Sequence, residues 1–331
     1  MPAIDRRTLL AGVAATGALA AAAARAQGDT IGAVPDLSGK AILITGCSSG
    51  FGQLSAVHFA ELGAKVFATM RNLPRPEADE LTRIAKDRNL DIHVIELDVL
   101  DDRQVTRAVA EAERIAGGAL DVLVNNAGIG ITGPVEVQDM EATRLAFDTN
   151  VFGYHRLVRA VLPAMRARKS GHIFSISSQL GRVIVPFAGH YSATKFAVEA
   201  MGEQLAYELV PHNIEVTVIE PGGYPTKVWV NRNAYSRDLR NRADEKHLGG
   251  YPQAVERMGE EDGSGRSADP MDIPRAMARV LAMPQGTRPV RLAVSGGSIP
   301  QARINEVSAK TQVDWLGGSP ALGPLVRAVH D

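Results

Sequence analysis

The sequence predicts an α/β fold: a single doubly wound parallel sheet of seven strands, with helices on both faces. Three observations support this prediction. Short apolar runs of strand type alternate with helical runs about seven times. The length of 331 residues and the 45% hydrophobic content suit one large domain with a packed core. A glycine-rich turn joins the first strand to the first helix. Because parallel strands need crossover connections, the intervening helices fall on the two sides of the sheet.

The expected strands are short apolar runs, at residues 40–45, 65–69, 92–97, 121–124, 172–177, 214–219 and 290–294. The expected helices follow them, at residues 53–62, the later part of 73–88, 101–116, 141–165, 191–210 and 271–282. Asp101 is well placed to cap the third of these helices.

Residues 227–268 differ from the rest of the chain. They are polar, charged and glycine-containing, with weak helical pieces such as 238–247. A long irregular insert after the end of a strand often forms a substrate lid, so we expect this one to close over the substrate. The alternative is a mobile surface loop.

The first 26 residues resemble an export signal. Arg6-Arg7 is followed by Thr-Leu-Leu, an alanine-rich apolar run and an Ala-Arg-Ala end at Ala26, as in twin-arginine signals. Cleavage after Ala26 removes three arginines and one aspartate, so the net charge changes from −1 to −3, which is −1 − (3 − 1). The alternative, an uncleaved membrane anchor, is disfavoured by the low hydrophobicity of the run. We expect a periplasmic protein, or a cytoplasmic one where the signal is not used.

The remaining organisation is a linker at residues 27–35, one domain at 36–298 and a tail at 299–331. The net charge of −1 implies no broad basic surface, so nucleic acid is not an expected partner. The single cysteine, Cys47, excludes an intramolecular disulfide and a cysteine-rich metal site. We interpret it as a small loop residue, and we expect no metal.

The glycine-rich turn, residues 46–52 (Gly-Cys-Ser-Ser-Gly-Phe-Gly), opens the first helix. Glycines allow the backbone to approach a diphosphate, and the helix N-terminus supplies N–H donors. The turn therefore indicates a Rossmann-type dinucleotide site, although its spacing differs from Gly-x-Gly-x-x-Gly. The expected cofactor contacts here are Gly46, Ser48, Ser49, Gly50, Phe51 and Gly52.

The end of the second strand bears on cofactor choice. Residues 69–72 (Thr-Met-Arg-Asn) lack the acid that usually holds the ribose of NAD. Arg71 can instead bind the 2′-phosphate of NADP, and Ser48 can add a hydroxyl. We expect NADP in preference to NAD, the alternative for Arg71 being a solvated surface arginine. Asp98 and Val99, after the third strand, are placed to border the adenine.

Tyr191 and Lys195 lie four residues apart and share one face of a predicted helix. A nearby ammonium group lowers the pKa of a phenol from its usual value of about 10. Such a phenol can exchange a proton with an alcohol or carbonyl. Ser178, at the end of the fifth strand, can hydrogen-bond the same oxygen. Asn150 lies inside a long apolar-faced helix, where it is costly unless it bonds something.

In this order, the motifs resemble those of the classical short-chain dehydrogenase/reductase (SDR) family over residues 36 to about 295. The matching segments are Thr45-Gly46-x-x-x-Gly50-x-Gly52, Asn125-Asn126-Ala127-Gly128, the tetrad of Asn150, Ser178, Tyr191 and Lys195, and Pro221-Gly222 to Thr226. The end of the second strand is similar to the NADP-preferring branch that includes 17β-hydroxysteroid and retinol dehydrogenases.

The resemblance implies an oxidoreductase that interconverts an alcohol and a ketone or aldehyde. Tyr191 would be the acid/base, and Lys195 would lower its pKa and bind the nicotinamide ribose. Ser178 would orient the substrate oxygen, and Asn150 would hold a water for proton relay. It further implies a hydrophobic small-molecule substrate, a homo-oligomer built on the long helices, and cofactor contacts from Asn126, Ala127, Gly128, Tyr191, Lys195, Pro221, Gly222 and Thr226.

Two other functions stay open. A nucleotide-binding sensor or scaffold could keep the fold without turnover, although it would not need Tyr191 and Lys195 together. An epimerase or dehydratase on the same scaffold is the third reading, and such enzymes usually carry longer substrate domains.

Overall fold

The computed structural model describes residues 34–331, of which Asp36–Asp331 form one compact unit. The expected export signal at residues 1–26 lies outside the described residues, as does most of the expected linker at 27–35. Within the described part, no helix is long and apolar enough to cross a membrane.

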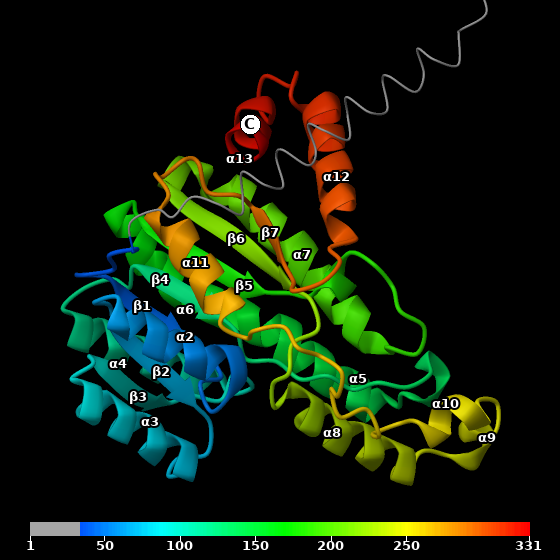
Figure 1. Ribbon diagram of the computed structural model, residues 1–331. Coiled ribbons are helices and arrows are strands. Elements are labelled where there is room, and N and C mark those ends of the chain that lie inside the picture. Colours follow the sequence, from blue (N-terminus) through cyan, green and yellow to red (C-terminus); the bar gives the residue numbers. More distant parts are fainter. Residues whose placement is uncertain (1–33) are drawn as a thin grey trace, which may run out of the picture. The chain divides into compact units, whose positions relative to one another are not determined.

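A seven-stranded sheet forms the centre of this unit (Figure 1). Its strands are β1 (Ala41–Ile44), β2 (Lys65–Met70), β3 (Ile92–Glu96), β4 (Val122–Asn125), β5 (Gly171–Ile176), β6 (Ile214–Pro221) and β7 (Arg291–Val294). Their spatial order is β3-β2-β1-β4-β5-β6-β7, and all neighbouring pairs are parallel. The predicted doubly wound parallel sheet is confirmed.

Side chains of the central strands alternate between the two faces of the sheet. In β1, Ile42 and Ile44 pack with Phe59 of α2 (Gly50–Glu61), whereas Leu43 packs with residues on the opposite face. Every residue of β1 and β4 is buried, as expected for strands covered on both sides. The winding reverses between β1 and β4, so a crevice is expected at their carboxyl ends.

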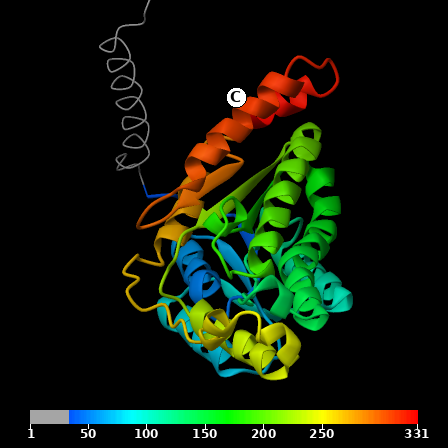
Figure 2. The same cartoon turned by 90° about the vertical axis from the view of Figure 1, so that its right-hand side faces the viewer.

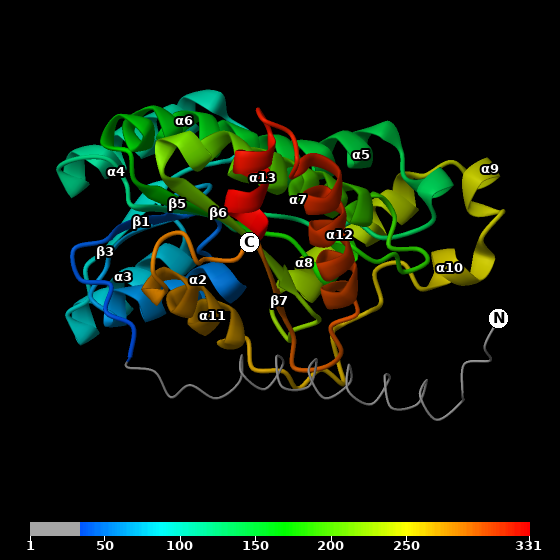
Figure 3. The same cartoon turned by 90° about the horizontal axis from the view of Figure 1, so that it is seen from above.

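Two layers of helices cover the sheet, and Figure 3 shows them on either side of it. One layer holds α2, α3 (Pro76–Arg88) and α11 (Asp272–Ala282). The other holds α4 (Asp102–Ala116), α6 (Gly153–Arg168) and α7 (His190–Leu209). The predicted cap of α4 is confirmed, because Asp101 Oδ1 accepts hydrogen bonds from the amides of Arg103 (2.8 Å) and Gln104 (3.0 Å).

The single helix expected at residues 141–165 is interrupted. It consists of α5 (Met140–Phe147), a π-helical turn (Asp148–Phe152) and α6, which ends at Arg168. Asn150 lies in the π-helical turn, completely buried. Single π-helical turns frequently occur at functional sites, and this one brings a polar side chain to the carboxyl edge of the sheet. Short 3₁₀ turns lie at Val135–Val137, Gln179–Gly181 and Val210–His212.

The insert after β6 is more regular than its sequence indicated. It contains α8 (Val228–Arg242), α9 (Glu245–Leu248) and α10 (Pro252–Glu256). The helical piece expected at 238–247 is divided between two helices, because α8 ends at Arg242 and Asp244 caps α9. Tertiary contacts explain the difference. The helix buries the polar residues Asn233 and Ser236 beside Leu239, so its sequence lacks an apolar stripe.

The tail forms two helices, α12 (Gln301–Leu316) and α13 (Gly323–His330). Figure 2 shows α12 leading away from the sheet, and α13 packs against α12. The side chain of Gln301, at the start of α12, is buried and donates to the Glu220 carbonyl at 3.3 Å. At the other end, His330 of α13 lies 2.6 Å from the Tyr207 hydroxyl of α7.

Candidate active site

Four predicted residues gather at the carboxyl edge of the sheet. Ser178 follows β5, Asn150 lies in the π-helical turn, and Tyr191 and Lys195 lie in the first turns of α7. Lys195 Nζ is 5.7 Å from the centre of the Tyr191 ring, so the predicted shared face is confirmed. The Ser178 Oγ accepts a hydrogen bond from the Leu180 amide at 3.1 Å, which fixes its orientation.

Asn150 joins two segments of the site. Its Nδ2 donates to the Ile129 carbonyl (2.8 Å) and to Thr194 Oγ1 (3.0 Å), and its Oδ1 accepts from the Ile129 amide (2.8 Å). Both amide hydrogens are therefore engaged, while Oδ1 keeps one acceptor position. A Cβ placed on Gly128 would lie 3.2 Å from Oδ1 and 3.8 Å from Lys195 Nζ, so the Asn150 amide and the Lys195 ammonium both lie near Gly128.

Lys195 is buried, and its Nζ donates to the Ile176 carbonyl at 2.8 Å. The ammonium also lies 5.6 Å from the centre of the Tyr154 ring, within the range of a cation–π interaction. Burial lowers the pKa of Lys195 to about 8, against an opposing effect of Glu199. Because this pKa is close to neutral pH, the Lys195 ammonium loses its proton at a lower pH than an ordinary lysine does.

The expected lowering of the Tyr191 pKa is wrong for the protein as described. Burial raises this pKa, and the Ser178 hydroxyl and the charge of Arg232 oppose the rise. The low-dielectric surroundings that bring Tyr191 and Lys195 together also penalise the phenolate. The phenol of Tyr191 is therefore protonated at neutral pH.

The glycine-rich turn and the Asn125–Gly128 segment are tied together. Thr45 Oγ1 accepts from the amides of Asn126 and Ala127, both at 2.9 Å, and Asn126 Nδ2 donates to the Thr45 carbonyl at 2.7 Å. A Cβ on Gly52 would lie 2.4 Å from the Gly46 carbonyl oxygen, so glycine is needed there. The Asn126 side chain thus shapes the turn, and its donors point at protein.

The N-terminus of α2 fits a dinucleotide diphosphate. Ser49 occupies the N-cap position, yet within residues 34–331 no side-chain hydrogen bond caps the helix, and its first turn holds no acid. Its free N–H groups and positive dipole end suit an anion. Gly50 has a φ of +59°, and a Cβ there would lie 3.5 Å from Thr226 Cβ, so the turn faces the segment after β6. Phe51 packs edge-on against Tyr224, with ring centres 5.5 Å apart.

The other predicted cofactor residues lie at or just after the carboxyl ends of β3 and β6. Pro221 ends β6, and the Gly222 amide donates to the Val294 carbonyl at 2.9 Å. Asp98 Oδ1 accepts from the Leu100 amide at 3.0 Å. The Val99 side chain is buried in the core, which leaves only its backbone for a ligand.

Arg71 is exposed at the end of β2, as predicted, and it contacts the insert. Its Nη2 donates to the Tyr235 hydroxyl of α8 at 3.2 Å, and this bond, with the charge of Asp98, raises the pKa of Arg71. On the same helix, Ser236 Oγ accepts from the Thr132 amide at 3.0 Å. The helix α8 therefore contacts both the end of β2 and the segment after β4.

Sequence reasoning missed several of these residues. Tyr154, Thr194 and Tyr235 are ordinary in sequence, and their roles come from partners 22 to 164 positions away. Among the described residues, no group of three or more His, Cys, Asp or Glu side chains could hold a metal ion. Cys47 is buried, and burial raises the pKa of its thiol to about 12, which leaves it unreactive.

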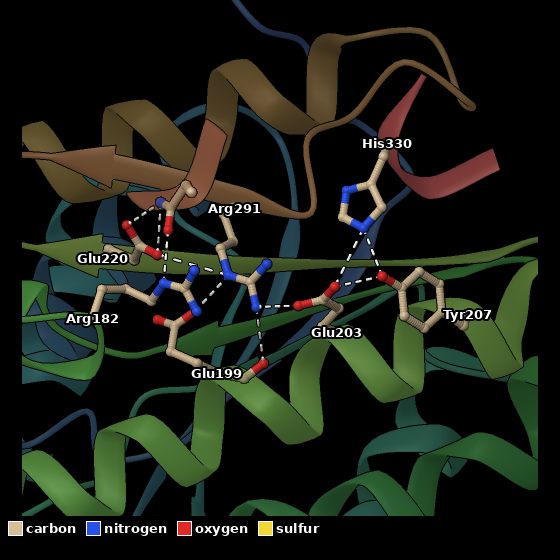
Figure 4. Close-up of polar contacts among 8 residues, drawn as sticks. Arg182, Glu199, Glu203, Tyr207, Glu220, Arg291 and His330 are labelled. Carbon is tan, nitrogen blue, oxygen red and sulfur yellow. Dashed lines mark hydrogen bonds and ion pairs between the residues drawn. The ribbon is translucent and has the colours of Figure 1, made fainter. Parts of the chain in front are cut away.

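A second polar cluster lies between α7 and the strands β6 and β7 (Figure 4). Arg291 of β7 bonds Glu199 (2.8 Å) and Glu203 (2.6 Å) of α7 and lies 3.9 Å from Glu220 of β6. The helices of the tail complete it. Asn305 Nδ2 donates to both oxygens of Glu220, at 2.9 and 2.7 Å.

This fold and this arrangement of residues define the class of the protein. The family model described as short chain dehydrogenase matches residues 40–236, and the chain belongs to that family. It is 42% identical over 191 residues to retinol dehydrogenase 8 of Bos taurus, covering 57% of this chain and 60% of that protein. It thus spans about 60% of the length of that relative.

Two further relatives cover more of the chain. A 3-ketodihydrosphingosine reductase of Bacteroides thetaiotaomicron is 35% identical over 243 residues, 73% of this chain and 83% of that protein. The crystal structure of a short-chain dehydrogenase from Streptomyces avermitilis matches with a TM-score of 0.64 and 31% identity, over 84% of this chain and 96% of that one.

Proposed function

We propose that this protein is an NADP(H)-dependent oxidoreductase that interconverts an alcohol and a ketone or aldehyde. The observation that carries the proposal is the convergence of Tyr191, Lys195 and Ser178 beside the uncapped N-terminus of α2. Family membership supports the same class of chemistry.

Bound nicotinamide would supply or accept the hydride at this site. Tyr191 acts as the acid/base. Because burial keeps its phenol protonated, it donates a proton to the substrate oxygen in the reductive direction. The Ser178 hydroxyl donates a second hydrogen bond to that oxygen and stabilises its developing charge. Lys195 supplies positive charge beside the phenol once Tyr191 gives up its proton, and it binds the nicotinamide ribose.

Asn150 positions this machinery. It fixes Thr194, the neighbour of Lys195, and its remaining acceptor position can hold a water beside Lys195 for proton relay. The residues of the glycine-rich turn and the segment from Pro221 to Thr226 hold the cofactor. Arg71 selects NADP over NAD, because a guanidinium recognises the 2′-phosphate through paired, charge-assisted hydrogen bonds.

The substrate is a small molecule with an apolar portion. The loop between Ser178 and Tyr191 exposes three apolar side chains, Ile184, Val185 and Phe187. Apolar side chains exposed beside a catalytic tyrosine suit an apolar ligand. The similarity to proteins named retinol dehydrogenase and 3-ketodihydrosphingosine reductase supports this class of substrate.

Two properties of the whole protein follow as proposals. The chain forms a homo-oligomer, supported by the exposed Val307 and Trp315 on α12, 65% and 76% accessible. Light scattering on the purified protein would test this, and a monomer mass at every concentration would count against it.

The export signal at residues 1–26 directs the protein to the periplasm, which N-terminal sequencing of a periplasmic fraction would test.

The enzyme class is tested by following the absorbance of NADPH or NADH with a panel of ketones and aldehydes, from small to steroid-sized. Turnover with NADPH is the expected result. Tight NADPH binding without turnover of any carbonyl would instead favour a sensor or scaffold on this fold.

A further inference from the structure

An arginine pair within the insert is built around one tryptophan. The guanidinium carbon of Arg232 lies 4.4 Å from the centre of the Trp229 ring, and that of Arg266 lies 3.8 Å from it. Glu261 joins the two arginines through its two carboxylate oxygens, at 2.7 Å from Arg232 and 2.5 Å from Arg266. Trp229 is itself fixed, because its Nε1 donates to the Tyr224 carbonyl at 2.7 Å. We call these four residues the arginine clamp.

The arginine clamp lies beside the segments that follow β4 and β6. A Cβ placed on Gly130, in the segment after β4, would lie 3.1 Å from Arg232 Cγ. A Cβ placed on Gly223, just after β6, would lie 2.8 Å from Arg266 Nε. The carboxyl ends of β4 and β6 flank that of β5, from which Ser178 follows. The clamp therefore lies over the edge of the sheet that carries the catalytic groups.

The arginine clamp has an excess positive charge and one hydrogen-bond donor without a partner among residues 34–331. Two guanidinium groups share one carboxylate, so the four residues carry a net charge of about +1 at neutral pH. The Arg232 side chain is 14% exposed, and its Nε has no hydrogen-bond partner within residues 34–331. A buried donor of a charged group without a partner is costly, and an anionic ligand would remove that cost.

Arg232 is also the clamp residue that acts on the reacting phenol. Its positive charge is among the influences that lower the pKa of Tyr191, against the larger effect of burial. The charge of Arg232 is therefore close enough to Tyr191 to act on its phenol.

We propose that Arg232 binds a carboxylate of the substrate, so that the substrate is an oxo acid or hydroxy acid whose carbonyl or hydroxyl reacts at Tyr191. This inference rests on the proposed function, and it adds an anionic group to the apolar substrate. Glu261 and Trp229 hold the guanidinium in place, which lowers the entropic cost of binding. The cofactor phosphates offer similar chemistry, but the N-terminus of α2 and Arg71 already face them.

The test compares acids with their neutral esters. Reduction of acetoacetate and 4-oxopentanoate by NADPH is measured beside reduction of their methyl esters, for the wild type, Arg232→Met and Arg232→Lys. Arg237→Met is the matched control, because Arg237 lies on the same helix and binds the Gly259 carbonyl within the insert. The affinity for NADPH is measured for each variant by fluorescence.

The expected result is a loss of about 10- to 100-fold in kcat/KM for the acids in Arg232→Met, since a hydrogen bond to a charged group is removed. The esters and the NADPH affinity should change less than about threefold, Arg232→Lys should recover part of the loss, and Arg237→Met should behave as wild type. An unchanged acid-to-ester ratio would overturn the inference. The inference would also be overturned if Arg232→Met lost affinity for NADPH and kept its preference for acids. Arg232 would then bind a phosphate of the cofactor and not a carboxylate of the substrate.

A binding measurement separates this inference from the proposed function. Butanoate, which has no carbonyl to reduce, is titrated into the NADPH complex while the cofactor fluorescence is followed. A response in the wild type that is lost in Arg232→Met supports the anion site even if no carbonyl is turned over. Turnover of neutral carbonyls, with no butanoate response and no preference for acids, would refute the anion site and leave the oxidoreductase intact.

Discussion

Replacement of Arg291 by methionine removes the central cation of the buried polar cluster. The Arg291 side chain is 5% exposed, and its partners Glu199, Glu203 and Glu220 are 2%, 10% and 0% exposed. Methionine keeps much of the volume and leaves three buried carboxylates near one remaining arginine, Arg182. The substitution therefore tests whether the cluster stabilises the contact between β7 and the catalytic helix.

The magnitude follows from the cost of an uncompensated buried charge. Removing one partner of a buried ion pair typically costs about 3–5 kcal/mol. At roughly 2–4 °C per kcal/mol for a large domain, the melting temperature should fall by about 6–20 °C. Arg275→Met is the matched control. Arg275 pairs with Asp269 where both are about half exposed, at 48% and 51%, so its loss should cost about 1 kcal/mol or less.

The pH dependence gives the sharper test. Burial raises the pKa of Glu220 to about 7 and also raises that of Glu199. A carboxyl group with a raised folded-state pKa favours folding at low pH, and that contribution is lost as the pH rises through the folded-state value. Without Arg291 the carboxylates are harder to ionise, so the destabilisation should be larger at pH 8 than at pH 5. Thermal unfolding of both variants at these pH values measures it. The reasoning would be refuted if Arg291→Met lowered the melting temperature no more than Arg275→Met does, or by the same amount at both pH values.

Three further outcomes are expected. Arg71→Ala should weaken NADPH binding by about tenfold or more and leave NADH nearly unchanged, by fluorescence titration, because only the 2′-phosphate loses its partner. Asn150→Ala should cost about 2–3 kcal/mol in urea unfolding, since the Ile129 amide and carbonyl lose their partners, and should also lower kcat. Carbonyl reduction should fall as the pH rises through about 8, where Lys195 loses its charge, and a flat profile from pH 7 to 9 would contradict this assignment.

Much of the fold was predictable because its signals are local. Central strands such as β1 and β4 are buried, largely apolar runs, and the Asp101 cap is set by neighbouring residues. The placing of Tyr191 and Lys195 on one face needed only helical periodicity.

The remainder depends on contacts between distant segments. The π-helical turn at Asn150 is stabilised by Ile129 and Thr194, and α8 is held by contacts with Arg71 and Thr132. The raised pKa of Tyr191 reflects burial, which a motif does not encode. The arginine clamp joins residues 29 and 5 positions apart within a segment that seemed irregular.

The most direct test of the account is the activity of Tyr191→Phe. The variant removes only a hydroxyl, so NADPH affinity and the melting temperature should stay close to those of the wild type. Measured by NADPH absorbance with the best ketone of the panel, kcat should fall by at least about 100-fold, because general acid catalysis is lost. A variant that binds NADPH normally and retains most of its kcat would contradict the assignment of Tyr191 as the proton donor.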